Sequence, residues 1–272
     1  MTNAAASPAA TGPGGAHFEA KVGAFYLLAM LLDTEPRGLP GARAEKIQFQ
    51  GAGDGFPLDD VIVHVRSFDG DAAVLEVQAK HRITFSAGDA AFEKVAGQIT
   101  EALKAGNLDS SDFHQLGIAT AQSSRKIDGA YQEVLSWARH SETPEAFFRK
   151  LARHGVSNAD MRTFVDTLKT HVAAFGGDAT DERIWTILRQ LQILVFDFSA
   201  EHGQSEALAR EQCKQALDPR ERNRAGSLWS ALCDIAQKVA DSGGEIAAET
   251  LRTDLVAKHG LGLKGCANIV PR

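Results

Sequence analysis

Leu75-Glu76-Val77-Gln78-Ala79-Lys80 is the stretch of this 272-residue chain from which the fold can be inferred. Its alternation of apolar and polar residues predicts a β-strand. Successive side chains of a strand point to opposite faces, so Glu76, Gln78 and Lys80 share one face and the apolar residues share the other. The sequence therefore places three polar side chains on one face of an otherwise apolar strand.

A second strand is predicted upstream, at Asp60-Val61-Ile62-Val63-His64-Val65. The same alternation puts its three valines on one face and Asp60 on the opposite face, together with Ile62 and His64. A carboxylate, a carboxamide and an ammonium group on neighbouring strands are the groups needed for a Mg²⁺ site with a lysine that activates water. The alternative is that Asp59 and Asp60 simply end the loop, and Asp59 is expected to cap the turn.

Each polar side chain has an expected role and a plainer alternative. Asp60 is expected to bind the metal ion, and Gln78 to supply a neutral oxygen, which weakens Mg²⁺ affinity relative to a carboxylate. Such a site is suited to phosphodiester hydrolysis. In that reaction Lys80 is expected to orient or deprotonate the attacking water and to stabilise the charge on the phosphorane. The alternative is that Lys80 is a surface lysine at a strand end. Glu76 is either a further metal ligand or a solvated side chain.

The order of the expected elements indicates an α/β fold. They are a helix, a three-stranded antiparallel meander, a second helix and a further strand, which together form a mixed sheet flanked by helices. In residue numbers these elements are 17–33; 46–50, 60–65 and 72–80; 86–105; and 113–120. From Ser124 onward the pattern is mainly helical, with one aliphatic run at 191–198 that predicts a strand.

Four motifs in this order resemble the PD-(D/E)XK nuclease superfamily, over roughly residues 15 to 125. They are Gly15-Ala16-His17-Phe18-Glu19 at the start of a helix, Leu58-Asp59-Asp60-Val61 at the start of a strand, Glu76 to Lys80 at the end of the next strand, and a helix containing Gln98. The Gln-x-Lys ending is the variant seen in Mrr-like restriction enzymes. The arrangement also looks like the double-strand DNA endonuclease domain that serves as effector in bacterial anti-phage systems, including CD-NTase-associated (CBASS) effectors and Lamassu-type nuclease subunits.

The resemblance implies a restriction-endonuclease-like sheet, a Mg²⁺ cofactor with Mn²⁺ as its substitute, and double-stranded DNA as substrate. It implies that Glu19 completes the metal site, although an interaction with the helix dipole is an alternative role for that carboxylate. Gln98 is implied to contact DNA or the metal ion. His81 and Arg82 extend Lys80 into a short basic cluster that is expected to meet a phosphate backbone.

Three regions are expected along the chain. Residues 1–16, rich in Ala, Pro and Gly, predict a disordered tail and do not fit a signal peptide. Residues 17–124 form the predicted nuclease domain, and residues 125–272 a mainly helical domain for regulation or interaction. No later stretch has the roughly 18 to 20 apolar residues of a membrane span. The three cysteines are widely separated, which favours a reducing, cytoplasmic environment.

Charge sets a further constraint on function. The net charge is −6, and residues 1–110 carry nine Lys/Arg against 14 Asp/Glu, a balance of −5. An acidic nuclease domain attracts phosphates weakly, so a second copy of the chain or another subunit of a defence complex is expected to supply basic surface. The leading hypothesis is a Mg²⁺-dependent endonuclease that cuts double-stranded DNA in anti-phage defence. The alternative is an inactive or weak nuclease-fold subunit that holds other proteins, and the sequence does not separate DNA from RNA as substrate.

Overall fold

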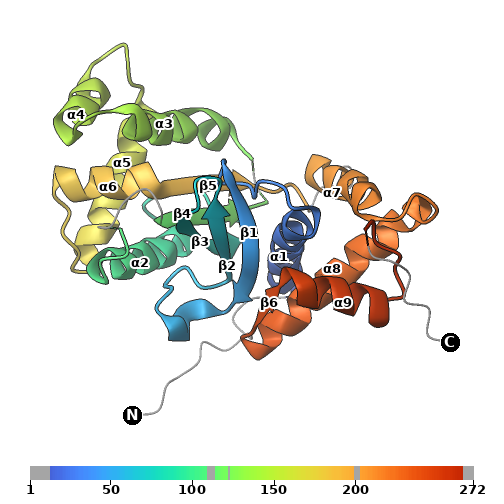
Figure 1. Ribbon diagram of the computed structural model, residues 1–272. Coiled ribbons are helices and arrows are strands. Elements are labelled where there is room, and N and C mark those ends of the chain that lie inside the picture. The colour runs from blue at the N-terminus through green and yellow to red at the C-terminus, as the bar shows by residue number, and fades with distance from the viewer. Residues whose placement is uncertain (1–12, 109–113, 122, 199–202, 266–272) are drawn as a thin grey trace.

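A mixed β-sheet between two layers of helices organises the chain (Figure 1). The computed structural model describes residues 13–108, 114–121, 123–198 and 203–265. Within these residues the sheet has six strands in the order β5-β4-β3-β2-β1-β6. The strands are β1 (Ala42–Phe49), β2 (Val61–Ser67), β3 (Ala72–Lys80), β4 (His114–Thr120), β5 (Leu191–Val195) and β6 (Glu245–Ala247).

The strand pairing follows the chain order at the centre of the sheet. β1, β2 and β3 form an antiparallel meander in which Val61 pairs with Val77. β4 lies parallel to β3, and β5 lies parallel to β4. A parallel neighbour requires a crossover, and the helix α2 (Ala90–Lys104) supplies it between β3 and β4. The short β6 pairs with the outer edge of β1.

Helices cover both faces of the sheet. On one side lie α1 (Pro13–Leu32) and three helices from the end of the chain; on the other lie α2 and four helices from the middle of the chain (Figure 1). The remaining helices are α3 (Gln132–His140), α4 (Pro144–Ala152), α5 (Ala159–Ala174), α6 (Asp181–Gln190), α7 (Gln204–Ala216), α8 (Ala225–Ser242) and α9 (Ala248–Ala257). Short 3₁₀ turns occupy Gly51–Asp54 (η2) and Arg222–Arg224 (η4), and a π-helical turn, Lys126–Tyr131 (η3), leads into α3.

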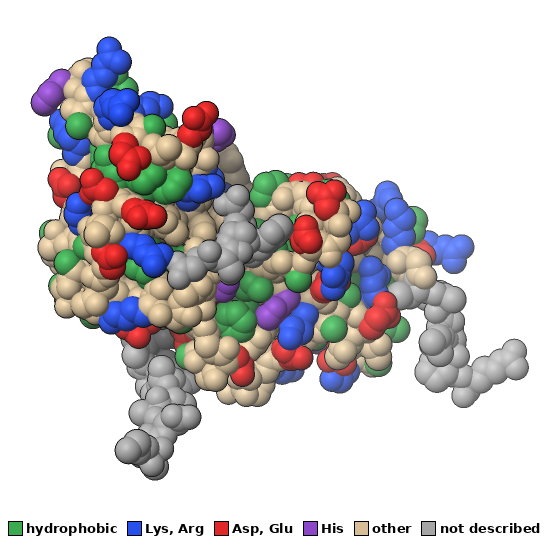
Figure 2. All heavy atoms as spheres, turned by 60° about the vertical axis from the view of Figure 1, so that its left-hand side comes forward, with side chains coloured by type: hydrophobic (Ala, Val, Ile, Leu, Met, Phe, Trp, Pro, Cys, Tyr) green, Lys and Arg blue, Asp and Glu red, His purple; other side chains and the backbone are tan. Residues whose placement is uncertain are grey.

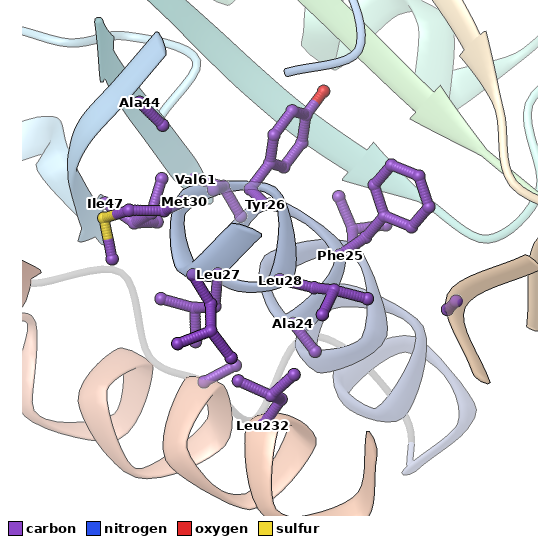
Figure 3. Close-up of a cluster of buried hydrophobic side chains, with 14 of the residues drawn as sticks. Ala24, Phe25, Tyr26, Leu27, Leu28, Met30, Ala44, Ile47, Val61 and Leu232 are labelled. Atoms are coloured by element: carbon purple, nitrogen blue, oxygen red, sulfur yellow. The ribbon is translucent and has the colours of Figure 1, made fainter. Parts of the chain in front are cut away.

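The helix α1 is buried on nearly all sides, because it lies between the sheet and α8. Figure 3 shows Tyr26 and Met30 directed toward the sheet and Leu27 directed toward Leu232 of α8. A helix with apolar residues all round must be covered all round to be stable in water. The C-terminal helices are therefore part of the packing that holds α1, and with it Glu19, in place.

The predicted α/β fold class is confirmed, with helix, antiparallel meander, helix and strand in the expected order. The strand predicted at 72–80 has the bounds of β3. Two strands of the same sheet, β5 and β6, come from residues 125–272, so the sheet includes strands from both predicted domains. Of the predicted tail, residues 13–16 belong to α1, and residues 1–12 lie outside the described part of the chain.

None of the described helices combines the length and the apolar character that a membrane span requires.

Candidate active site

A cavity of about 570 Å³ lies where β2 begins and β3 ends. Its walls come from the first turns of α1, the end of β1, the N-terminal half of α2 and the last turn of α8. Five of the side chains predicted from the sequence or the resemblance line this cavity: Glu19, Asp60, Gln78, Lys80 and Gln98. The predicted site residues from four separate stretches of sequence therefore meet in one place.

Asp60 is positioned by the antiparallel pairing of β2 with β3. It immediately precedes β2, and Oδ2 of its carboxylate accepts a hydrogen bond from the backbone N–H of Ala79 at 2.7 Å. The same oxygen accepts a hydrogen bond from the side-chain amide of Gln78. The residue is 8% exposed, so its carboxylate has few waters and depends on these donors.

Gln78 lies in a chain of amide hydrogen bonds that fixes its orientation. Gln98 Nε2 donates to the backbone carbonyl of Pro57 at 2.8 Å and to Gln78 Oε1 at 2.5 Å. Because the carbonyl of Pro57 can only accept, Gln98 must present its NH₂ group there, and Gln78 must present its oxygen to Gln98. The NH₂ of Gln78 then faces Asp60. In this arrangement Gln78 is a donor to the carboxylate, and its oxygen is directed away from the carboxylate of the predicted metal site.

Lys80 ends β3 with its ammonium group inside the cavity. Its Nζ lies 3.8 Å from Asp60 Oδ2 and donates to the carbonyl of Ala79 at 3.2 Å, and its side chain is 17% exposed. The next residues turn away from the strand, so the lysine stands at the open end of the polar face. A partly buried ammonium beside a carboxylate has the position needed to orient a water molecule or to stabilise charge on a phosphate.

Glu19 enters the cavity from α1, on the far side from α2. Its Oε1 accepts a hydrogen bond from Gln50 Nε2 at 2.8 Å. Gln50 follows β1 and has a left-handed backbone, with φ of 55°, which turns the chain into η2. The carboxylate is thus held by the turn after β1, and it faces the same cavity as Asp60.

Carboxyl groups are concentrated in this cavity. Burial is the main cause that raises the pKa of Glu19 to about 8, and the neighbouring Asp60 raises it further while Lys80 lowers it. Burial likewise raises the pKa of Asp60 to about 6, against the lowering effect of Lys80. The pKa of Asp59 is also raised, again by burial first. Three carboxyl groups therefore share a confined space with less positive charge than their ionised forms need.

The donor set fits a hard divalent cation in part. Asp60 and Glu19 provide carboxylate oxygens, which Mg²⁺ prefers, and Asp59 lines the same cavity. Gln98 Oε1 is buried and has no hydrogen-bond partner among the described residues, so one polar atom beside the cavity remains to be satisfied. Across that same part of the chain, no group of three or more His, Cys, Asp or Glu side chains is arranged to hold a metal ion. Asp60 and Glu19 would thus be the carboxylate ligands of the cation, and water or substrate would occupy its other coordination positions.

Three predicted residues lie elsewhere. Glu76 is fully buried, and its carboxylate accepts hydrogen bonds from the backbone N–H of Leu58 at 3.0 Å and from Asn107 at 3.3 Å. It also pairs with His114 at 2.5 Å, so it joins β3 to its surroundings and does not line the cavity. His81 packs edge-on against Phe18, and Arg82 is exposed; neither lines the cavity.

The cavity also contains residues that sequence reasoning did not select. Lys94 lies on α2 four positions before Gln98, and this spacing places both on one helix face. Asp59, expected to cap the turn, accepts a hydrogen bond from Gln98 Nε2 at 3.3 Å. Asp241, in the last turn of α8, is about 180 residues from Asp60 in sequence, and no local pattern connects the two.

No protein-family model matches the chain, and no curated protein matches it. Among solved structures, the chain is similar to a Cap4 receptor from Moraxella osloensis that contains a SAVED/CARF domain. The TM-score of this similarity is 0.46 and the sequence identity 14%. The match covers 91% of this chain and 49% of the other, so the chain spans about half the length of that structure.

Proposed function

We propose that this chain is a divalent-metal-dependent endonuclease whose active site is the cavity around Asp60 and Lys80. The observation that carries the proposal is the convergence of Glu19, Asp60 and Lys80 from three elements, α1, the start of β2 and the end of β3. Two carboxylates and an ammonium group in one half-buried cavity match the requirements of phosphodiester hydrolysis: a cation site and a group that handles water.

Each residue has a defined part in the proposed reaction. Asp60 and Glu19 would hold the cation, and Gln78 donates its hydrogen bond to Asp60, which keeps that carboxylate in position. Mg²⁺ bound there would supply a Lewis acid that stabilises negative charge on the phosphoryl oxygens. Lys80 orients the attacking water and stabilises the charge that develops on the pentacoordinate phosphate.

The order and spacing of the motifs support a narrower proposal. Their resemblance to defence endonucleases favours double-stranded DNA as the substrate and bacterial anti-phage defence as the setting. We propose further that self-association or a partner subunit licenses cleavage, because the acidic chain offers phosphates little long-range attraction.

A cleavage assay tests the proposal. The chain is incubated with supercoiled plasmid, single-stranded DNA and a structured RNA, each with Mg²⁺, with Mn²⁺ and with EDTA, alone and together with co-expressed products of neighbouring genes. Conversion of the plasmid to nicked and linear forms, with Mg²⁺ or Mn²⁺ and not with EDTA, is the expected result. Cleavage that persists in EDTA would contradict the metal-dependent mechanism, and preferential cleavage of RNA would contradict the proposed substrate.

A second candidate function is a nuclease-fold subunit that binds other proteins without cutting. Two observations favour it. The NH₂ group of Gln78 donates to Asp60 while its oxygen accepts from Gln98, so the amide already has protein partners. In addition, no group of three or more His, Cys, Asp or Glu side chains that could hold a metal ion occurs among the described residues. In this case the plasmid remains intact under every condition, while the chain still co-purifies with its partner. The same assay therefore separates the two candidates.

A further inference from the structure

A second lysine, Lys94, stands at the rim of the candidate active site. It lies on α2 and lines the cavity of Asp60 and Lys80. It also lines a shallow hollow beside that cavity, together with Pro57, Gly97 and Phe175 and with the carboxylates of Glu93 and Glu101. Lys94 therefore stands between the candidate active site and the neighbouring surface of α2.

The two lysines of the cavity differ in their contacts. The ammonium of Lys80 is held by the carbonyl of Ala79 and lies close to Asp60. Lys94 is exposed, and within the described part of the chain it forms no ion pair and no hydrogen bond through its side chain. Its charge nevertheless reaches the site, because it lowers the pKa of both Asp59 and Asp60. An ammonium near a reaction centre and without a protein partner is available to a ligand.

The residues beside Lys94 anchor the helix that carries it. Gln98, one turn further along α2, is bonded to the carbonyl of Pro57 and to Gln78. At the start of the helix, the side chain of Asp89 accepts a hydrogen bond from the backbone N–H of Ala91 at 2.9 Å. The backbone of Lys94 is thus fixed relative to Asp60, whereas its side chain is free to move toward a ligand.

We propose that Lys94 binds the backbone phosphate adjacent to the scissile phosphate, on the part of the nucleic-acid strand that crosses α2. An ammonium group binds a phosphate as a point charge and reads no base, so the contact adds affinity without sequence preference. Lys80 and Lys94 are the cationic side chains among the described residues that line the cavity, whose other charged lining residues are Glu19, Asp59, Asp60 and Asp241. A polyanion that enters the cavity therefore meets positive charge beyond Lys80 at Lys94. This inference rests on the proposed nuclease function.

Binding and cleavage are measured separately to test it. Binding is measured with the Lys80→Ala protein, in which cleavage is expected to be lost. A fluorescein-labelled DNA duplex is titrated at several salt concentrations with this protein and with three double variants. These add Lys94→Ala, Lys94→Arg or Lys104→Ala to Lys80→Ala. Lys104 is the control on the same helix, because it lies ten residues further along α2, about 15 Å by helix rise, outside the cavity. Its ammonium already has protein partners, Glu101 and the carbonyl of Phe175. Cleavage kinetics are measured with the single variants, and circular dichroism checks each fold.

Lys94→Ala is expected to weaken binding roughly threefold to tenfold and to reduce the slope of log K against log salt by about 0.9. It is also expected to raise KM with little change in kcat. Lys94→Arg should retain the wild-type affinity and KM, and Lys104→Ala should leave the affinity and KM unchanged. Unchanged affinity and salt slope in Lys94→Ala, or an equal loss in Lys104→Ala, would overturn the inference while cleavage by the wild-type chain would still support the nuclease. If Lys94→Ala weakens binding but no protein cuts DNA, Lys94 is a phosphate-binding residue and the proposed cleavage fails. If the chain neither binds nor cuts DNA, both the inference and the proposed function fail.

Discussion

At the scale of single residues, the direction of one amide changes the role expected for Gln78. The sequence predicts Gln78 as a metal ligand, whereas the hydrogen bonds from Pro57 through Gln98 turn its NH₂ group toward Asp60. A carboxylate that accepts a fixed amide donor is held in one orientation. Gln78 thereby acts on the proposed cation site through Asp60.

This role predicts the effect of Gln78→Glu. The new carboxylate would lie beside Asp60 and replace a donor by a like charge, so the metal-free protein should lose roughly 1 to 3 kcal/mol of stability. Because an added carboxylate strengthens a site for hard cations, Mn²⁺ should bind more tightly than in the wild type. Chemical unfolding in EDTA and isothermal titration with Mn²⁺ measure the two effects. Tighter metal binding together with unchanged stability in EDTA would show that Gln78 does not support Asp60.

The raised pKa of Glu19 predicts how the metal-free protein responds to pH. The folded chain holds the proton of Glu19 up to a pKa of about 8, whereas the unfolded chain releases it near 4.5. Between these values the folded state binds more protons, so its stability falls as pH rises through this window. Glu19→Gln should flatten the fall. Urea unfolding in EDTA at several pH values measures both slopes, and a stability that rises with pH equally in the two proteins would contradict the assignment.

At the scale of elements, the close approach of α1 to β1 is what holds Glu19 at the cavity. A Cβ added to Gly23 would overlap the ring of Phe49 at the end of β1 and would lie 3.3 Å from Cβ of Ala236 on α8. The absence of a side chain at Gly23 lets the helix lie between the sheet and α8. The position of Glu19, one turn earlier on the same helix, depends on this contact.

Gly23→Ala is therefore expected to destabilise the chain by about 1 to 3 kcal/mol, through overpacking at the ring of Phe49. Gly14→Ala, on the same helix, is the control: an added Cβ meets no atom within 4 Å, and alanine favours the helix by up to about 1 kcal/mol. Thermal unfolding of the two variants measures the difference. Equal stability of Gly23→Ala and Gly14→Ala would mean that α1 moves without cost.

The elements themselves were largely predictable from the sequence, since the alternation in β2 and β3 fixes which face each side chain takes. Alternation does not determine which residues on one face of a strand reach the cavity. Glu76 shares a face with Gln78, yet its carboxylate accepts a hydrogen bond from the backbone N–H of Leu58 and pairs with His114. Nor does alternation report contacts between distant segments. Lys94 and Asp241 reach the cavity through the packing of α2 and α8, and the β6 edge likewise depends on tertiary pairing.

For the molecule as a whole, net charge is the feature that we expect to limit the proposed DNA binding. The net charge is −6, and Figure 2 shows Lys/Arg and Asp/Glu side chains interspersed over much of one face. Long-range attraction of a polyanion requires an excess of positive charge, and its strength falls steeply with salt. A single chain is thus expected to bind duplex DNA weakly at physiological ionic strength.

We therefore expect the isolated chain to cut poorly, and an oligomer or a complex with a partner to cut efficiently. Size-exclusion chromatography with light scattering, run on the same samples as the cleavage assay, should show activity in fractions larger than the 29.1 kDa monomer. A monomer that digests plasmid efficiently at physiological salt would contradict this expectation, while leaving the assignment of the active site intact.

Whether this cavity hydrolyses phosphodiesters is tested by plasmid cleavage with Lys80→Ala, wild type and Lys104→Ala. The three proteins are compared with Mg²⁺, under the conditions in which wild type is most active. The ammonium of Lys80 contacts one backbone carbonyl and approaches Asp60, so its removal should leave the circular dichroism spectrum unchanged. Lys80→Ala is expected to lose cleavage by about 100-fold or more, while Lys104→Ala is expected to retain it. Cleavage by a folded Lys80→Ala at the wild-type rate would contradict the central claim that this cavity hydrolyses phosphodiesters.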